Sequence, residues 1–462
     1  MSGFLIKGGT VITMDGERRI IEDGAVAICG KKIVEVGPTS ELEGNHPEKE
    51  VIDASGKVIM PGFVNAHNHM YSMLLRNIDL SDWPEDFGDT LTLWWWPKVE
   101  DTCTREDAYA GTLLAASEML KRGVTTTADT VEAPNAVPGV LDKVTEAIEE
   151  TGIRALICFE ASERISAENG LLGHRENVNF FKKWNSETDP RIQGSLSIHT
   201  PFSSSPKFIK RVRGDADKLG ARIQLHIAQS VYEVDFIKTH FDKAGSIFHL
   251  NDLGFLGPDV TAAHCIHISD REIDILAETG TNVSFNVKSN TKFPVGIAPV
   301  REMLQKGVNV GIGLDGDGSD ILDMFELMVH SSYMLRSIYL DPATFTAGQA
   351  LEMATINGAR ALGLGDEVGS LEAGKKADII LVNLTDALQF TPVHDVLEAL
   401  VFSARGTDVD TVLVDGRIVV KNKRLMTVNE EDVILKARKQ AIEYRKRFDA
   451  QPVAASWMLP TI

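Results

Sequence analysis

The sequence predicts an α/β protein: a (β/α)8 barrel of the TIM type, with a small β-sandwich domain assembled from both ends of the chain. Three observations lead to this fold class. Short strand patterns with Asp and Gly turns fill both chain ends. Helical and short apolar segments alternate over the long stretch between them. Several of the apolar segments also end in a histidine or an aspartate.

The two ends of the chain carry matching strand patterns. These patterns lie at 4–9, 10–16, 24–28, 32–37, 377–382 and 409–420. The simplest interpretation is one composite β-sandwich domain, formed by residues 1–60 and 368–428, with a long insertion between its halves. The charged helical pattern that opens residues 429–462 predicts a helix packed on the outside of the protein, followed by a tail.

Residues 61–367 have a different character. Helical patterns at 105–122 and 138–151 alternate with short apolar runs, which lie at 154–159, 194–199, 221–226, 260–264, 282–286 and 308–315. Strands that alternate with helices over about 300 residues indicate a parallel α/β barrel. A doubly wound open sheet is the alternative, but no G-x-G-x-x-G turn follows any of these strands.

Composition narrows the class of protein. The chain is 43% hydrophobic and 24% charged, and its formal net charge of −19 argues against a nucleic-acid or anionic-membrane partner. The four cysteines are far apart and form no Cys-x-x-Cys pair, which is typical of a reducing compartment. There is no signal-peptide pattern and no apolar run of the roughly 18 residues that a membrane span needs. We expect a soluble cytoplasmic protein that acts on a small molecule.

The apolar run at 58–64 leads into His67 and His69, two histidines separated by one residue. Side chains two positions apart on a strand point to the same side, so both imidazoles can reach one point. Two neutral imidazoles on a rigid strand make half of a divalent-metal site. The spacing alone decides little, because it arises often by chance.

Other apolar runs end in the same kinds of residue, namely His199, His226, His264 and Asp315. In a barrel, the C-terminal ends of all strands face one mouth, where such side chains converge. Any one of these histidines alone is more commonly a structural residue, but five strand ends that repeat the pattern favour a shared site. We expect the metal ligands to be His67, His69, His226 and Asp315.

Three imidazoles and one carboxylate suit one divalent ion per chain, zinc by default, with cobalt or iron(II) as alternatives. Such an ion lowers the pKa of a bound water toward neutrality. Asp315 is the candidate base for the proton of that water. His264 is expected to orient the resulting nucleophile or to stabilise a developing oxyanion.

The order of these residues resembles that of the amidohydrolase superfamily, and within it the branch of the atrazine/triazine hydrolases and cytosine deaminases. The matching motifs are V-I-M-P-G-F-V-N-A-H-N-H at 58–69, Trp96-Pro97, E-M-L-K-R-G-V-T-T at 118–126, G-I-A-P-V at 296–300, Asp315-Gly316, T-I-N-G-A-R-A-L-G at 355–363 and G-S-L-E-A-G-K-K-A-D at 369–378. The resemblance covers nearly the whole chain. It implies a single bound metal, hydrolysis of a carbon–nitrogen or carbon–halide bond in a small molecule, and a homo-oligomer.

Two positions depart from the pattern of the family. Its deaminases carry His-x-x-Glu at the fifth strand, where the glutamate exchanges protons with the ring and the leaving amine, but this chain has Gln229. A glutamine amide can hydrogen-bond but cannot exchange a proton near neutral pH. The family also often has a histidine where this chain has Phe285. Loss of a general acid–base typically lowers a rate by about 10²- to 10⁴-fold.

We therefore expect hydrolysis of a carbon–nitrogen or thiocarbamate bond in a small non-peptide amide, urea or carbamate, as in the phenylurea and molinate hydrolases that the chain resembles. Its apolar substituent would pack against Phe285 and Trp94, and His199 would contact the substrate. Gln229 is expected to be a catalytic residue together with Asp315 and His264. The alternative is an aminohydrolase, a deaminase or dechlorinase of a purine, pterin or triazine-like ring. A metal-free scaffold is disfavoured because all four expected ligands are present.

Overall fold

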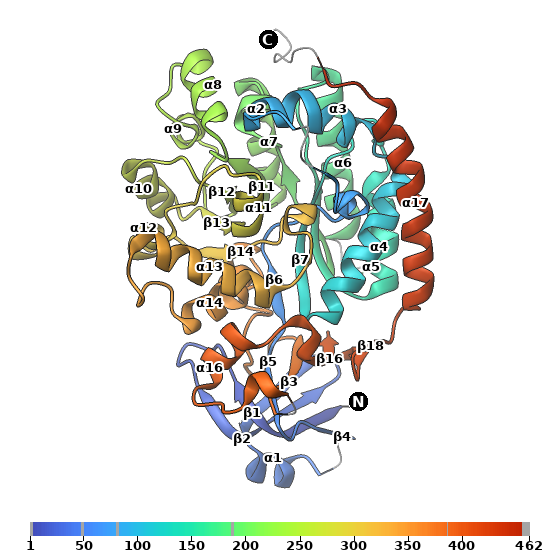
Figure 1. Ribbon diagram of the computed structural model, residues 1–462, viewed down its shortest axis with the longest axis vertical. Helices are drawn as coiled ribbons and strands as arrows, with labels where there is room; N and C mark the ends of the chain where they lie inside the picture. The colour runs from blue at the N-terminus through green and yellow to red at the C-terminus, as the bar shows by residue number, and fades with distance from the viewer. Residues whose placement is uncertain (1–2, 48–49, 80–82, 186–188, 386, 455–462) are drawn as a thin grey trace.

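A computed structural model describes residues 3–47, 50–79, 83–185, 189–385 and 387–454. It contains a barrel ringed by helices, and below the barrel a β-domain that joins strands from the two ends of the chain (Figure 1). The predicted fold class is confirmed. The boundaries proposed for the domains stay a prediction.

Parallel strands occupy the eight positions of the barrel. They are β6 (Phe63–Asn65), β7 (Val124–Val131), β8 (Arg154–Phe159), the pair β9 (Ile192–Gly194) and β10 (Leu196–Ser197), β11 (Ile223–Ile227), β12 (Val260–His264), β13 (Asn282–Phe285) and β14 (Val310–Ile312). β9 and β10 share the fourth position, because only Ser195 separates them and its backbone N–H bonds to Ile157 of β8.

Contacts between the first and last strands bring the two halves of the sequence motif together. The N–H of Ala66, after β6, donates to the carbonyl of Ile312 in β14 at 2.9 Å. The N–H of Asp315 donates to the carbonyl of His67 at 3.1 Å. Residues almost 250 positions apart in the chain therefore sit at one edge of the barrel.

Helices surround the barrel and form much of the connections between its strands. They are α4 (Arg105–Lys121), α5 (Val140–Thr151), α6 (Ala167–Trp184), α7 (Pro206–Leu219), α8 (Val231–Phe241), α9 (Ser246–Asp252), α10 (Asp270–Thr279), α11 (Val287–Lys292), α12 (Val300–Gln305), α13 (Met324–Tyr339), α14 (Ala347–Ala354) and α15 (Ile356–Ala361). Short helices α2 (Phe87–Asp89) and α3 (Trp96–Lys98) flank a π-helical turn, η2 (Thr90–Trp95), above the barrel (Figure 1). None of the helices within the described ranges is both long and apolar enough to cross a membrane.

The predicted C-terminal helix forms as α17 (Glu430–Ala450) and runs along the outside of the barrel beside α4 (Figure 1). Its N-terminus is capped by Asn429, whose side chain accepts from the N–H groups of Glu431 and Asp432. One stripe of this charged helix is buried, and the Tyr444 hydroxyl donates to the carbonyl of Val99 at 2.8 Å. The helix thus braces the segment that leads into α4.

The β-domain is one continuous sheet rather than two separate halves. Its strands are β1 (Phe4–Ile12), β2 (Ile20–Cys29), β3 (Lys32–Pro38), β4 (Glu50–Asp53), β5 (Lys57–Pro61), β15 (Ile379–Asn383), β16 (Val409–Val414), β17 (Arg417–Lys421) and β18 (Arg424–Leu425). The two ends of the chain meet where β5 pairs antiparallel with β15. Helices α1 (Thr39–Asn45) and α16 (Val396–Glu398) complete this region.

The apolar run at 58–64, which the sequence presents as one strand, is divided at Gly62. β5 before it belongs to the composite sheet and β6 after it belongs to the barrel. A Cβ at Gly62 would lie 2.2 Å from the side chain of Thr125, so only glycine allows the chain to pass β7 this closely. The N–H of Gly62 also donates to Asp378, which ties the crossing to the second half of the sheet.

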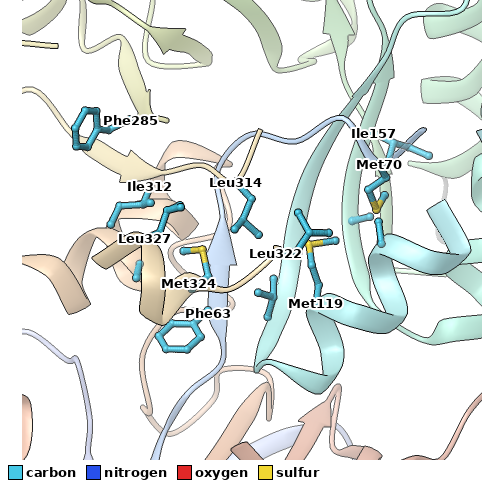
Figure 2. Packing of buried hydrophobic residues seen from close by; sticks show 14 of the residues in the cluster. Phe63, Met70, Met119, Ile157, Phe285, Ile312, Leu314, Leu322, Met324 and Leu327 are labelled. Atoms are coloured by element: carbon cyan, nitrogen blue, oxygen red, sulfur yellow. The ribbon is translucent and has the colours of Figure 1, made fainter. Parts of the chain in front are cut away.

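A buried hydrophobic cluster supports the barrel beneath its first and last strands (Figure 2). Phe63 of β6 packs edge-on against Phe325 of α13, with ring centroids 4.8 Å apart. Leu314 and Leu322, which flank the loop after β14, are also fully buried in this cluster. The loop that carries Asp315 is therefore anchored by packing on both sides.

The two domains share a buried ion pair, and its loss should destabilise the protein. Arg154 begins β8 and forms two hydrogen bonds with Asp378, at 2.9 and 3.0 Å, while its side chain is 2% exposed. Arg154→Met should lower the free energy of unfolding by about 3–5 kcal/mol, because the buried carboxylate loses its partner. Denaturant unfolding followed by circular dichroism measures the change.

The control is Arg271→Met, which removes an ion pair with Glu278 in which both side chains are more than half exposed. It should change stability by less than about 0.5 kcal/mol. If the two substitutions lowered the free energy of unfolding equally, the buried interdomain pair would contribute no more to stability than an exposed ion pair.

Candidate active site

The polar residues at the strand ends converge as the sequence predicts. The Nε2 atom of His69, just beyond β6, lies 3.2 Å from Nε2 of His67 and 3.2 Å from Nε2 of His226 on β11. Oδ1 of Asp315, after β14, lies 3.1 Å from Nε2 of His67 and 3.3 Å from Nε2 of His69. His264 at the end of β12 completes the group, with its Nε2 4.0 Å from Oδ2 of Asp315.

Burial and neighbouring groups shift the pKa values at this point in opposite directions. Burial disfavours a charged carboxylate, yet the imidazoles of His264, His67 and His69 lower the pKa of Asp315 well below its usual value. Burial lowers the pKa of His67 to about 4. Burial also acts against a charged His69, but Asp315 and Glu160 outweigh it and raise the pKa of His69 to about 10.

These residues suit a divalent cation. Ligand atoms of His67, His226, His264 and Asp315 all lie within 4.8 Å of one another, and all four residues are buried. His69 shares the same centre through its 3.2 Å contacts. Imidazole nitrogens with a single carboxylate form a ligand set typical of zinc and related ions. We infer a metal centre held by His67, His69, His226 and Asp315, with His264 beside it.

The outer nitrogen of each of three rings is fixed by a hydrogen bond, which aims the inner nitrogen at the centre. Nδ1 of His69 bonds the carbonyl of Thr130 at 3.0 Å, and Nδ1 of His226 bonds the carbonyl of His199 at 3.1 Å. Nδ1 of His264 donates to Oδ1 of Asn290 at 2.9 Å, which leaves its Nε2 as an acceptor.

Two asparagines of the motif V-N-A-H-N-H hold the loop of Asp315. Oδ1 of Asn65 accepts from the N–H of Leu314 at 2.8 Å, and Oδ1 of Asn68 accepts from the N–H of Gly316 at 2.7 Å. The backbone N–H groups of the residues before and after Asp315 are therefore held by two asparagine side chains at and just beyond the end of β6. The sequence placed these asparagines beside the histidines but gave no indication of this role.

The backbone at the strand ends is held in an unusual conformation. His264 and Asp315 have φ angles of +75° and +60°, and Ala228, two residues after His226, has a φ of +49°. Non-glycine residues in the left-handed region cost of order 1–3 kcal/mol each and persist only where their surroundings hold them. Such conformations cluster at functional sites, in agreement with the positions of these residues at the centre.

A cavity opens above this centre. Its walls are formed by His69, Tyr71, Trp83, Phe87, Thr90, Leu91, Trp95, Glu100, His199, His226, Gln229, His264, Ser289, Phe293, Asp315 and Gly318. His199, predicted to bind substrate, and Gln229, predicted to be catalytic, both line it. The remaining wall is largely aromatic: Trp83 stacks on Phe293 with ring centroids 5.3 Å apart.

Two predicted substrate contacts do not line this cavity. Phe285 is fully buried in the core (Figure 2). Successive side chains of a strand alternate, and its neighbour Ser284 takes the inward direction, toward the space that a Cβ on Gly313 would fill. Trp94 packs against Phe448 of α17 with ring centroids 5.2 Å apart and does not line the cavity. In the π-helical turn, Trp95 faces the cavity instead.

A buried charged network lies beside the cavity and was missed from the sequence. Arg164 donates to Glu132 at 2.6 Å and to Glu100 at 3.1 Å. Oε2 of Glu132 lies 3.1 Å from Nε2 of His199. Burial lowers the pKa of His199 to about 4, so the ring is neutral. Glu132 and Glu160 directly follow the ends of β7 and β8, so the signal was the same strand-end position that identified the histidines.

The profile of the amidohydrolase family matches residues 58–419, which is most of the chain. The chain belongs to the amidohydrolase family. It is a hydrolase that acts on carbon–nitrogen bonds other than peptide bonds. The expectation of a superfamily member is thereby confirmed.

Curated relatives and solved structures resemble the chain over nearly its full length. It is 38% identical to the 5'-deoxyadenosine deaminase of Methanosarcina barkeri over 97% of this chain and 100% of the relative. It is 38% identical to the 5-methylthioadenosine/S-adenosylhomocysteine deaminase of Desulforudis audaxviator over 90% and 94%. An adenosine deaminase from Xanthomonas campestris with bound zinc superposes with a TM-score of 0.86 at 27% identity, covering 97% and 99% of the two chains.

The predicted place in the triazine hydrolase branch is not confirmed. The atrazine chlorohydrolase of Arthrobacter aurescens, with zinc, has a TM-score of 0.80 over 95% of this chain and 100% of its own, but at 24% identity it shows the fold alone. The names of the more similar relatives agree with the deaminase alternative rather than with urea or carbamate hydrolysis. The predicted homo-oligomer stays a prediction.

Metal binding should release a proton at neutral pH. Because the pKa of His69 is raised to about 10, its ring is protonated at pH 7 until a cation takes its place. Zinc affinity should therefore rise as the pH increases toward that value. Titration calorimetry at pH 7 in two buffers of different ionisation enthalpy should show about one proton released per zinc. Affinity that is independent of pH would contradict this electrostatic picture.

Proposed function

We propose that this protein is a metal-dependent deaminase of adenosine-type nucleosides, including those without a 5'-hydroxyl group. The observation that carries the proposal is full-length similarity at 38% identity to a 5'-deoxyadenosine deaminase, together with a clustered histidine–aspartate centre at the base of an aromatic cavity. The similarity to a methylthioadenosine/S-adenosylhomocysteine deaminase supports the same class of substrate.

The residues at the centre can provide the proton transfers that hydrolysis requires. A bound divalent ion would lower the pKa of a water molecule and so supply a nucleophile near neutral pH. Asp315, whose low pKa keeps it ionised, would accept the proton of that water. The Nε2 atom of His264, an acceptor 4.0 Å from Oδ2 of Asp315, would orient the water. Of the two roles predicted for His264, this geometry favours orientation over stabilisation of an oxyanion.

The cavity suits a nucleoside with a flat ring and an apolar substituent. Trp83, Trp95 and Phe293 offer aromatic faces and edges against which a purine or a 5'-alkyl or thioether group can pack. Glu100 adds a carboxyl group on the cavity wall, anchored by Arg164 at 3.1 Å, that can hydrogen-bond ribose hydroxyls.

One residue favours a second candidate function. Gln229 lines the cavity where a deaminase needs a group that protonates the heterocycle, and its amide can hydrogen-bond there but cannot transfer a proton. Amides, ureas and carbamates need no such ring protonation, because the ion polarises their carbonyl directly. Hydrolysis of such substrates is therefore the alternative that the experiment must separate from deamination.

A substrate panel on zinc-loaded protein tests the proposal. The panel contains adenosine, 5'-deoxyadenosine, 5'-methylthioadenosine, S-adenosylhomocysteine, a phenylurea and a thiocarbamate. We expect ammonia release from the adenosine derivatives, with higher kcat/KM for those with apolar 5' groups. The change in ultraviolet absorbance as the adenine base becomes hypoxanthine measures the reaction. Asp315→Asn is the control, and it should abolish turnover because it removes both a ligand and the base.

Hydrolysis of the phenylurea or the thiocarbamate without ammonia release from any adenosine derivative would overturn the proposal and establish the second candidate. Turnover of neither group by protein shown to hold one zinc per chain would also reject it.

Gln229→Glu tests how the ring is protonated. If deamination proceeds with only a hydrogen bond from Gln229, a carboxyl group there should raise kcat for ammonia release by about 10²-fold or more, since it adds a general acid. Stopped-flow assays of zinc-loaded variants measure the change, and Gln229→Leu, which cannot hydrogen-bond, is the comparison. A fall in rate for Gln229→Glu would mean that the amide itself is required.

A further inference from the structure

Glu160 lies behind the proposed metal centre, between two histidines. It directly follows β8, is 1% exposed, and its N–H is held by the carbonyl of Val131 at 2.9 Å. Its Oε1 lies 3.4 Å from Nδ1 of His226, and its Oε2 lies 3.6 Å from Nε2 of His199. The two oxygens of one carboxylate thus face one inferred metal ligand and one residue of the cavity wall.

The contact with His226 bears on metal binding. The Nε2 atom of His226 faces the centre, so Nδ1 carries the hydrogen and donates to the carbonyl of His199 at 3.1 Å. Oε1 of Glu160 approaches the same N–H from a second direction. A carboxylate on the outer N–H of an imidazole makes the inner nitrogen a better donor to a cation and fixes the orientation of the ring.

The contact with His199 bears on the cavity. Nε2 of His199 lies between Oε2 of Glu132, at 3.1 Å, and Oε2 of Glu160, at 3.6 Å. Because two carboxylates face Nε2, the hydrogen of the neutral ring resides there. Nδ1 of His199 is left as an unprotonated acceptor, and within the described part of the chain it has no hydrogen-bond partner. A substrate N–H or O–H is a suitable partner for it.

We propose that Glu160 is a positioning residue that holds His226 for the metal ion and His199 for the substrate at the same time. This inference rests on the metal site of the proposed function. Glu132 differs in kind, because its Oε1 is bound by the fixed charge of Arg164 at 2.6 Å. The ring neighbours of Glu160 are the imidazoles of His226 and His199, so it reaches the metal ligands through His226 and the cavity through His199.

The test is the zinc affinity of the full chain. Glu160→Gln keeps the shape of the side chain and replaces one carboxyl oxygen by an NH2 group, and it should weaken zinc binding by about 10- to 100-fold in competition with a chelator. Glu160→Asp keeps a carboxyl group at a greater distance from the rings and should give an intermediate affinity. The matched control is Glu233→Gln: Glu233 is also 1% exposed and lies near the same strand end, but it bonds the N–H of Ala228 and the hydroxyl of Ser246 rather than a ring.

Glu233→Gln should change zinc affinity by less than about threefold. This result would show that replacing another buried carboxyl group near the same strand end does not by itself weaken zinc binding. Thermal unfolding of the metal-free variants checks that they fold. If Glu160→Gln fails to fold, the Glu160→Asp protein carries the test, and wild-type affinity in it alongside unchanged histidine signals would reject the inference.

Nitrogen-15 NMR of labelled histidines gives a second readout that a merely structural role would not move. In the wild type, zinc should shift the signals of both His226 and His199, with His199 kept as the Nε2–H tautomer. In Glu160→Gln, His199 should populate both tautomers. Unchanged zinc affinity and an unchanged His199 tautomer in Glu160→Gln would overturn the inference. Absence of zinc binding by the wild type would instead reject the proposed function.

Discussion

The carboxylate of Asp315 among three imidazoles is the interaction on which the site depends. Its oxygens lie 3.1 to 4.0 Å from the rings of His67, His69 and His264, in a position closed to solvent. A buried carboxylate is costly unless charge or hydrogen bonds compensate it. The cluster therefore favours a cation at its centre, and the barrel is built so that four strand ends reach it.

Support for that arrangement comes from residues that do not themselves reach the centre. Asn65 and Asn68 bind the backbone on either side of Asp315, while Thr130 and Asn290 fix the outer nitrogens of His69 and His264. Glu160 has a similar position behind His226, with its Oε1 3.4 Å from the outer nitrogen of the ring. Rigid support of this kind holds ligands and proton-transfer groups in place before a substrate binds.

The two sides of the cavity have different chemical characters. The base carries the polar cluster common to a metal-dependent hydrolase, whereas the wall formed by the segment 83–95 and Phe293 is aromatic. α17 and the residues that follow it brace this wall: Phe448 of the helix packs on Trp94, and the N–H of Ala454, beyond the helix, donates to the carbonyl of Leu93 at 2.8 Å. A helix that the sequence presents only as charged and external thus supports the substrate side of the site.

The sequence by itself determined the barrel, the composite sheet and the convergence of His67, His69, His226, His264 and Asp315, because strand periodicity and the common direction of parallel strand ends are local properties. Only the tertiary structure decided that Phe285 and Trp94 point away from the cavity, that Gly62 splits one apolar run between two sheets, and that Glu100, Glu132 and Glu160 gather beside the centre. Those outcomes depend on which face of a strand or turn meets which neighbour, and the spacing of residues along a chain does not contain that information.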